Sequence, residues 1–123
     1  MLKSIFLVGI GSFAGGVLRY VVSLIVRPVA GFPIHTFIVN VLGCLLIGLL
    51  YGLFYRTSST AGTCCLLLTT GLCGGFTTFS TFANESLSML QTGNWLMFAV
   101  YVTGSIILGL CSVFFGYWLA GRC

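Results

Sequence analysis

The residues of this chain that could contact an ion lie in one run, TTGLCGGFTTFSTFANES, which covers residues 69–86. Phe79 and Phe82 are three positions apart, so they share one face of a helix. A phenyl ring is electropositive at its edge, and two ring edges beside a narrow passage could contact an anion that has lost its water. Ser80 and Thr81 add hydroxyl donors next to the rings. Plain packing of the rings against lipid or protein is the alternative interpretation.

The glycine pair Gly74-Gly75 precedes these residues and predicts a break in the helix, because glycine is a poor helix former. Two half-helices would leave unpaired carbonyls at the end of the first half, which suit a cation. They would leave unpaired N–H groups at the start of the second half, which suit an anion. The hydroxyls of Thr77 and Thr78 could satisfy some of these groups, or could bond back to carbonyls of their own helix. One long tilted helix is the alternative to a break.

Two further pairs of polar residues are spaced by one helical turn inside apolar segments. Thr36 and Asn40 form one pair, and Tyr101 and Ser105 form the other. Polar side chains are costly in lipid, so they mark candidate sites along an ion pathway. Hydrogen bonding between neighbouring helices is the alternative role.

Two charged residues, Arg19 and Glu85, fall inside the predicted helices and need a partner or a role there. Arg19 could anchor the fold, neutralise Glu85 or a group of carbonyls, or attract anions. Glu85 is the chain's one acid, and a single carboxylate suits a structural ion pair better than catalysis. His35, at a helix start, is predicted to play a polar role at the membrane surface. The sequence contains neither a Ser-His-Asp set, a metal cluster among its six cysteines, nor a phosphate-binding loop, so an enzyme is not expected.

Composition determines the class of protein. Of 123 residues, 59% are hydrophobic and 5% are charged, and the mean hydropathy is +1.17. Soluble domains have about 25% charged residues, so this chain cannot cover a surface that faces water. A spanning helix needs roughly 20 apolar residues, which predicts an all-α membrane protein with four transmembrane helices in a single domain, residues 1–123. The expected helices cover about residues 2–26, 35–55, 61–75 plus 78–91 (the third, broken near Gly74-Gly75), and 95–120.

The net charge of +4 comes from single basic residues near the predicted helix ends, where they would reach the lipid headgroups. Nucleic acid is therefore not an expected partner. Four spans place Lys3, Arg56 and Arg122 on one side of the membrane, against one or two basic residues, Arg27 with or without Arg19, on the other. This weak bias allows insertion in both orientations, and hence an antiparallel dimer. The small-residue pairs Gly11/Gly15 and Gly48/Gly52 suit close helix packing, although glycine is common in membrane helices in any case.

Three segments together resemble the bacterial fluoride channels of the Fluc or CrcB type. They are GSFAGGVLRY at residues 11–20, HTFIVNVLGCLLIG at residues 35–48, and TTGLCGGFTTFSTF at residues 69–82. The third segment is highly specific, and the likeness covers nearly the whole chain. The resemblance implies a dual-topology antiparallel homodimer with two pores in the bacterial inner (plasma) membrane. Such a protein is a multi-pass channel that exports fluoride passively and relieves its toxicity.

The resemblance also implies roles for particular residues. Phe79 and Phe82 match the family's pore-lining phenylalanines, and Asn40 matches its pore asparagine. The backbone carbonyls of Gly74 and Thr77 match a central structural sodium site that two subunits share. The remaining matches are a polar track and two supporting residues: Thr36, Tyr101 and Ser105 for the track, and Arg19 and Glu85 for the support.

Two other functions compete with this interpretation. A small dual-topology proton-coupled exporter also has four short helices, but it needs a membrane-buried acid that alternates between proton and substrate. The first helix has no acid, and Glu85 lies near the far end of the broken segment. A membrane scaffold subunit would explain the small-residue packing. It would not explain a costly broken helix with four hydroxyls and two rings.

Overall fold

The computed structural model describes residues 1–56 and 61–122, and every regular element in these ranges is a helix. The short loop predicted at residues 56–60 therefore lies, except for Arg56, outside the described residues. The helices are α1 (Leu2–Ile25), α2 (Ile34–Arg56), α3 (Ala61–Cys65), the π-helix η1 (Leu66–Cys73), α4 (Gly74–Phe76), α5 (Phe79–Gln91) and α6 (Trp95–Ala120). The all-α prediction is confirmed. We call α3, η1, α4 and α5 together the third region.

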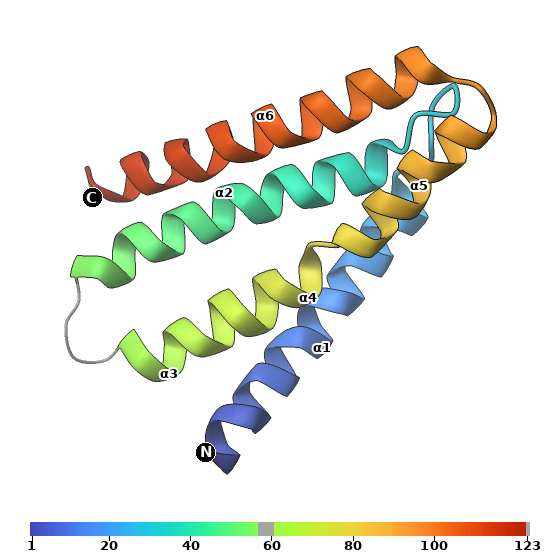
Figure 1. The fold of residues 1–123 in the computed structure, drawn as a ribbon. Helices are drawn as coiled ribbons and strands as arrows, with labels where there is room; N and C mark the ends of the chain where they lie inside the picture. The colour runs from blue at the N-terminus through green and yellow to red at the C-terminus, as the bar shows by residue number, and fades with distance from the viewer. Residues whose placement is uncertain (57–60, 123) are drawn as a thin grey trace.

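Four segments are long and apolar enough to cross a membrane, as predicted: Leu2–Ile25, Ile34–Tyr55, Gly62–Gln91 and Trp95–Ala120. Many of their large apolar side chains are exposed, which is the pattern expected where lipid is the solvent. Both termini lie at the end of the molecule opposite the α1–α2 and α5–α6 connections (Figure 1). An even number of crossings requires this arrangement.

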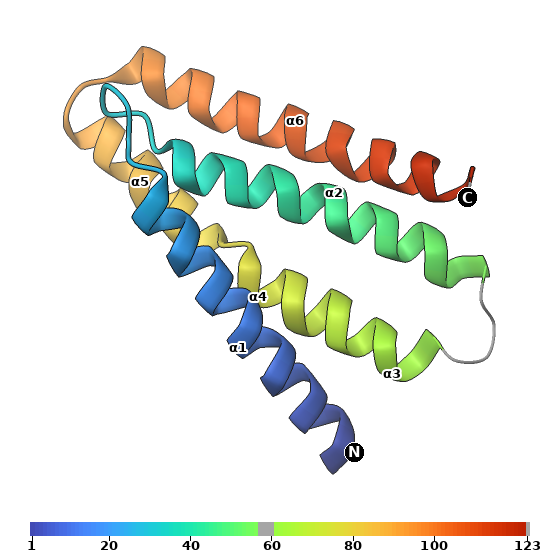
Figure 2. The ribbon, with the colours of Figure 1, turned by 180° about the vertical axis from the view of Figure 1, so that it is seen from behind.

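The helices associate as two pairs. In Figures 1 and 2, α1 crosses the third region near α4, whereas α2 and α6 run side by side. The crossing depends on Gly11 and Gly15, because a Cβ on either would collide with backbone atoms of η1 and α4. On the other side, a Cβ on Gly75 would lie 2.8 Å from the Cα of Ser12. Glycines on both helices thus let the two backbones touch.

The α2–α6 pair uses glycine in the same way. A Cβ on Gly48 would collide with the backbone of Val113, and a Cβ on Gly116 would lie 2.8 Å from the amide nitrogen of Leu49. The two small-residue pairs noted in the sequence, Gly11/Gly15 and Gly48/Gly52, therefore pack within one chain.

The third region departs from α-helical geometry before it breaks. Residues Leu66–Cys73 form a π-helix, an uncommon geometry that often occurs at functional sites. The hydroxyl of Thr69 donates to the carbonyl of Cys65 at 2.7 Å, a back-bond that competes with the helix's own N–H donors. The wider coil brings the backbone of Gly71 against Gly11 of α1.

The break itself lies at Thr77-Thr78, just after the glycine pair near which it was predicted, whereas the expected half-helices left residues 76–77 between them. Gly74 is helical, with φ −63° and ψ −37°, whereas Thr77 and Thr78 are extended, with ψ of 157° and 110°. The physical reason is packing. The glycines are needed for contact with α1, and the adjacent threonines can end the helix because their hydroxyls and Asn40 supply hydrogen bonds.

We expect Gly15→Ala to lower the free energy of unfolding by about 1–3 kcal/mol, because the added methyl group would overlap the α4 backbone. Gly16→Ala is the matched control, since a Cβ on Gly16 has no atom within 4 Å. That control should be neutral or slightly stabilising, because alanine is the better helix former. Thermal unfolding in detergent would measure both variants. Equal midpoints would contradict the close crossing.

Candidate functional site

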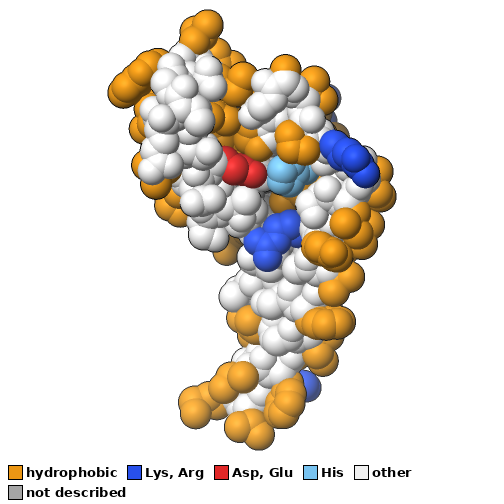
Figure 3. Space-filling model, turned by 90° about the vertical axis from the view of Figure 1, so that its right-hand side faces the viewer, with side chains coloured by type: hydrophobic (Ala, Val, Ile, Leu, Met, Phe, Trp, Pro, Cys, Tyr) orange, Lys and Arg blue, Asp and Glu red, His pale blue; other side chains and the backbone are white. Residues whose placement is uncertain are grey.

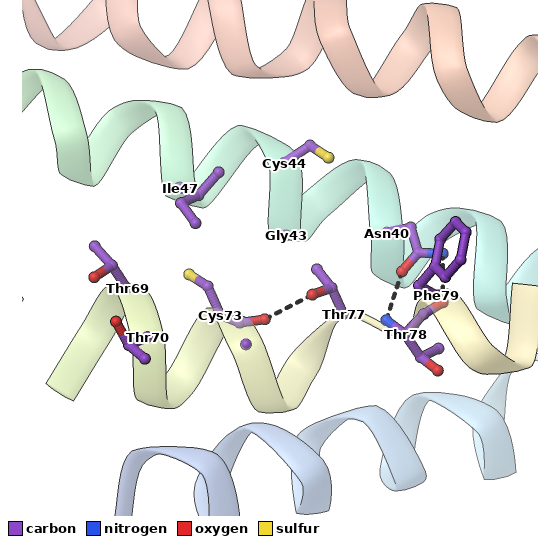
Figure 4. A pocket seen from close by; sticks show the side chains of 11 residues that line it. Asn40, Gly43, Cys44, Ile47, Thr69, Thr70, Cys73, Thr77, Thr78 and Phe79 are labelled. Atoms are coloured by element: carbon purple, nitrogen blue, oxygen red, sulfur yellow. Dashed lines mark hydrogen bonds between the residues drawn. The ribbon is translucent and has the colours of Figure 1, made fainter. Parts of the chain in front are cut away.

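The carboxamide of Asn40 bridges the break in the third region. Its Oδ1 accepts from the Thr78 N–H at 2.8 Å, and its Nδ2 donates to the Thr78 carbonyl at 3.2 Å. Figure 4 shows Asn40 on α2 facing the extended segment. One side chain thereby satisfies both backbone groups of a residue that has left the helix. An unpaired backbone group at membrane depth would cost several kcal/mol, by order of magnitude.

The hydroxyl residues around the break divide into two kinds. Thr77 bonds back to the carbonyl of Cys73 at 2.9 Å, which is the alternative foreseen for hydroxyls here. Thr78 instead acts as the N-cap of α5: its Oγ1 accepts from the Thr81 N–H at 3.3 Å and donates to the Thr81 Oγ1 at 2.9 Å. Ser80 and Thr81 are exposed on α5.

The two phenylalanines that follow the break lie at the start of a row of aromatic rings. The ring centroids of Phe79 and Phe82 are 6.0 Å apart, and Phe82 lies 5.1 Å from Tyr101. Tyr101 in turn contacts Phe32 edge to face at 5.3 Å. Phe82 is half-buried, whereas 80% of the surface of Phe79 is exposed. The row thus leads from an open surface into the protein.

Glu85 collects polar groups from two other helices. Its Oε1 accepts from the Thr36 hydroxyl at 2.8 Å, and its Oε2 accepts from the Tyr101 hydroxyl at 2.7 Å. The Nε2 of His35 lies 3.5 Å from Oε1. The carboxylate therefore ties α2 and α6 to α5. Within the described residues, the basic side chain within 4.0 Å of the carboxylate is His35, which pairs with it as an ion only when protonated, and Arg19 makes no such contact.

Ser105 lies one turn beyond Tyr101 on α6, and its position is unusual. Its Oγ is buried and has no hydrogen-bond partner among residues 1–56 and 61–122. Tyr101 is fully buried and directs its own hydroxyl to Glu85. Since buried polar atoms are almost always paired, the Ser105 hydroxyl is available to a ligand or a water molecule.

A groove of about 490 Å³ opens along the break between α2 and the third region (Figure 4). We call it the break groove; its lining includes Asn40, Gly43, Cys73, Gly74, Thr77 and Phe79. Gly74 and Thr77 lie together on this groove, as their predicted common role requires. In a continuous helix the Gly74 carbonyl would accept from the Thr78 N–H, but that N–H donates to Asn40. The carbonyl oxygen therefore lacks its helical donor.

A second cavity, of about 300 Å³, contains Arg19. Its lining also includes His35, Thr36, Thr78 and Thr81, and we call it the Arg19 cavity. Figure 3 shows the acidic and imidazole side chains next to each other on one face, with basic side chains close by. Arg19 thus shares a cavity with the hydroxyl residues Thr78 and Thr81 of the break.

The cluster at Glu85 was only partly foreseen from the sequence. His35 was expected to play a polar role at the membrane surface, and its pairing with Glu85 was missed. A signal was present in the three-residue spacing of Phe79, Phe82 and Glu85, which places all three along one side of α5. No local pattern connects His35 with a residue of α5.

The family model described as "CrcB-like protein, Camphor Resistance (CrcB)" matches residues 6–117. The chain belongs to this family. It is 45% identical over 121 residues to a protein of Phocaeicola vulgatus named "Fluoride-specific ion channel FluC", covering 97% of this chain and 99% of that protein. A protein of the same name from Chlorobaculum tepidum is 47% identical over 121 residues, covering 98% and 96%.

A third CrcB-family relative, also named "Fluoride-specific ion channel FluC", comes from Azobacteroides pseudotrichonymphae. It is 45% identical over 119 residues, covering 95% of each chain. The resemblance to the CrcB family is therefore confirmed over nearly the full length. With the four spanning helices, these relatives show that the chain is a multi-pass bacterial membrane protein. Ion channels are not a class of enzyme.

We expect Asn40→Ala to lower the free energy of unfolding by about 2–4 kcal/mol, because it leaves the Thr78 N–H and carbonyl unpaired. Asn84→Ala is the matched control, since Asn84 is exposed on α5. Thermal unfolding in detergent would measure the difference. If both variants unfold at the wild-type midpoint, Asn40 does not stabilise the break.

Proposed function

We propose that this chain is a fluoride-specific ion channel that lets fluoride leave the bacterial cell passively through the inner membrane and so relieves its toxicity. The observation that carries the proposal is the row of anion-compatible groups running from the break groove to Ser105, by way of Phe79, Phe82 and Tyr101. The full-length relatives named as fluoride channels support the choice of ion.

Fluoride must exchange its water for protein groups along this row. Asn40 uses one of its two amide hydrogens on the Thr78 carbonyl, which leaves the second for an anion. The edges of Phe79 and Phe82 offer partial positive charge without a strong hydrogen bond. The Ser105 hydroxyl, which has no partner in the described residues, lies one turn from Tyr101 on α6. Thr36 and Tyr101 complete the proposed path, although both donate to Glu85 while no ion passes.

A second copy of the chain, in the opposite orientation, completes the proposed channel. The break groove exposes Phe79 and carries the free Gly74 carbonyl, and irregular backbone at this depth has to be covered by protein or water. The two sides of the membrane differ little in basic residues, which permits both orientations. The proposed assembly is therefore an antiparallel homodimer with dual topology, surrounded by lipid.

We further propose that a sodium ion is held between the two copies by the carbonyls of Gly74 and Thr77. Both residues line the break groove. Their backbone carbonyls can offer oxygen atoms to a cation without any charged side chain. Each copy supplies two oxygens, so two copies supply four, and hard cations prefer such ligands. A bound cation would offset the partial negative charge at the carbonyl end of the first half-helix. Its role in the proposal is structural.

We expect purified protein in liposomes to release fluoride without a proton gradient, as read with a fluoride-selective electrode. Phe82→Ile should slow release about tenfold or more, because it removes the ring between Phe79 and Tyr101. Phe13→Ile is the matched control on α1, because it makes the same substitution at a ring that is 76% exposed and lies outside the row of rings. Release that requires a proton gradient would favour the exporter. If Phe82→Ile releases fluoride at the wild-type rate, the proposed role of the rings is contradicted.

Replacing sodium with a large organic cation should weaken the dimer, because the four carbonyls would then lack a shared ion. Size-exclusion chromatography at low protein concentration would measure the dimer fraction, with potassium as a second replacement. A dimer fraction that is the same in every salt would contradict the sodium site. This result would leave the fluoride channel itself unaffected.

A further inference from the structure

His35 lies between two cavities at the loop end of α2. It lines the Arg19 cavity on one side. On the other side it lines a cavity of about 440 Å³, whose lining includes Glu85, Asn84 and Ser88 and which we call the loop-end cavity. The imidazole is 22% exposed, and its Nε2 lies 3.5 Å from the Glu85 carboxylate. Its Nδ1 is buried without a partner in the described residues.

We propose that His35 is a proton-responsive control on Glu85: when His35 takes up a proton, it neutralises the carboxylate and increases fluoride conduction. The inference rests on the proposed channel function. It adds that His35 makes the rate of conduction depend on pH. Histidine is the residue type whose charge ordinarily changes between pH 5 and pH 8. The control would therefore act within the range of pH that bacteria commonly meet.

The charges around His35 determine the direction of the effect. Glu85 faces it from α5, Arg19 and Tyr20 line the same cavity from α1, and Tyr101 on α6 binds the far oxygen of Glu85. The Glu85 carboxylate lies 3.5 Å from Nε2 and carries the charge opposite to that of a protonated imidazole. Arg19, in the same cavity, carries the same sign of charge as a protonated His35.

The hydrogen bonds explain how a proton on His35 would reach the conduction path. With His35 neutral, Glu85 keeps its negative charge and holds the hydroxyl protons of Thr36 and Tyr101. An anion near Phe82 then meets a negatively charged carboxylate. The hydroxyls of Thr36 and Tyr101 donate to that carboxylate and not to the anion. With His35 protonated, a positive charge lies 3.5 Å from the same Oε1 that accepts from Thr36. This charge offsets that of the carboxylate and weakens its attraction for the Thr36 hydroxyl, which can then turn to donate to fluoride.

A purely structural role for His35 is the competing explanation. In that case the imidazole fills space at the start of α2 and the contact with Glu85 only joins α2 to α5. A structural role predicts lower stability when His35 is replaced. It does not predict a change in how conduction depends on pH.

The test measures fluoride release from liposomes at equal pH on both sides, between pH 8 and pH 6. Release from protein-free liposomes is subtracted at each pH, because protonated fluoride crosses lipid by itself. The wild-type rate should rise at least about threefold as the pH falls. His35→Gln should remove this rise, and His35→Lys should give a high rate throughout. Asn84→Gln is the control in the loop-end cavity and should keep the wild-type dependence.

A second measurement does not depend on conduction. The chain contains one histidine, so the imidazole signals in an NMR spectrum of protein without a histidine tag belong to His35 alone. These signals should shift between pH 8 and pH 6, and Glu85→Gln should move the pH range of that shift. An imidazole that does not titrate here, or that titrates identically in Glu85→Gln, would overturn the proposal.

The outcomes separate the two levels of inference. Fluoride release that is equal at pH 8 and pH 6, or a rise that survives in His35→Gln, contradicts the role of His35 and leaves the channel standing. Absence of release at every pH contradicts the channel itself. In that event the NMR titration still decides whether His35 and Glu85 form a proton-responsive pair.

Discussion

The hydrogen bonds between the Asn40 carboxamide and the Thr78 backbone are the interaction on which the rest of the site depends. An extended residue inside a membrane helix exposes an N–H and a carbonyl that lipid cannot satisfy. Asn40 satisfies both from the neighbouring helix, and in doing so it takes the donor that the Gly74 carbonyl would otherwise use. One side chain thus permits the break, places Phe79 at the start of α5, and leaves an oxygen free on the groove.

Close contacts between helix backbones hold Asn40 opposite the Thr78 backbone. A Cβ on Gly43 would overlap the side chain of Thr77, and Gly43 lies on the same side of α2 as Asn40. On the opposite side of the third region, Gly75 allows contact with Ser12 of α1. The segment before the break is therefore held between two helices at positions where a side chain would not fit. Its glycines allow close packing against the neighbouring helices, and Thr77 and Thr78 after them form the break.

The predictions from sequence succeeded where physical patterns are local. Four apolar stretches predicted four spanning helices, and the three-residue spacing of Phe79 and Phe82 placed their rings 6.0 Å apart. The break was placed at the glycines because low helix propensity is visible in a sequence, whereas packing against Ser12 is not. The pairing of His35 with Glu85 joins residues fifty positions apart by tertiary contact, so no local signal reveals it.

The single acid of the chain shows how a costly charge is kept in such a protein. A carboxylate in an apolar surrounding needs compensating groups, and Glu85 accepts from the hydroxyls of Thr36 and Tyr101, with the imidazole Nε2 of His35 at 3.5 Å. These groups come from α2 and α6, so the carboxylate also fixes how those helices meet α5. Because both hydroxyls point at Glu85, any anion that moves along Phe82 must compete with the carboxylate for them. In the proposed channel the charge on Glu85 is therefore part of the barrier to an anion, and a partner that offsets this charge would lower the barrier.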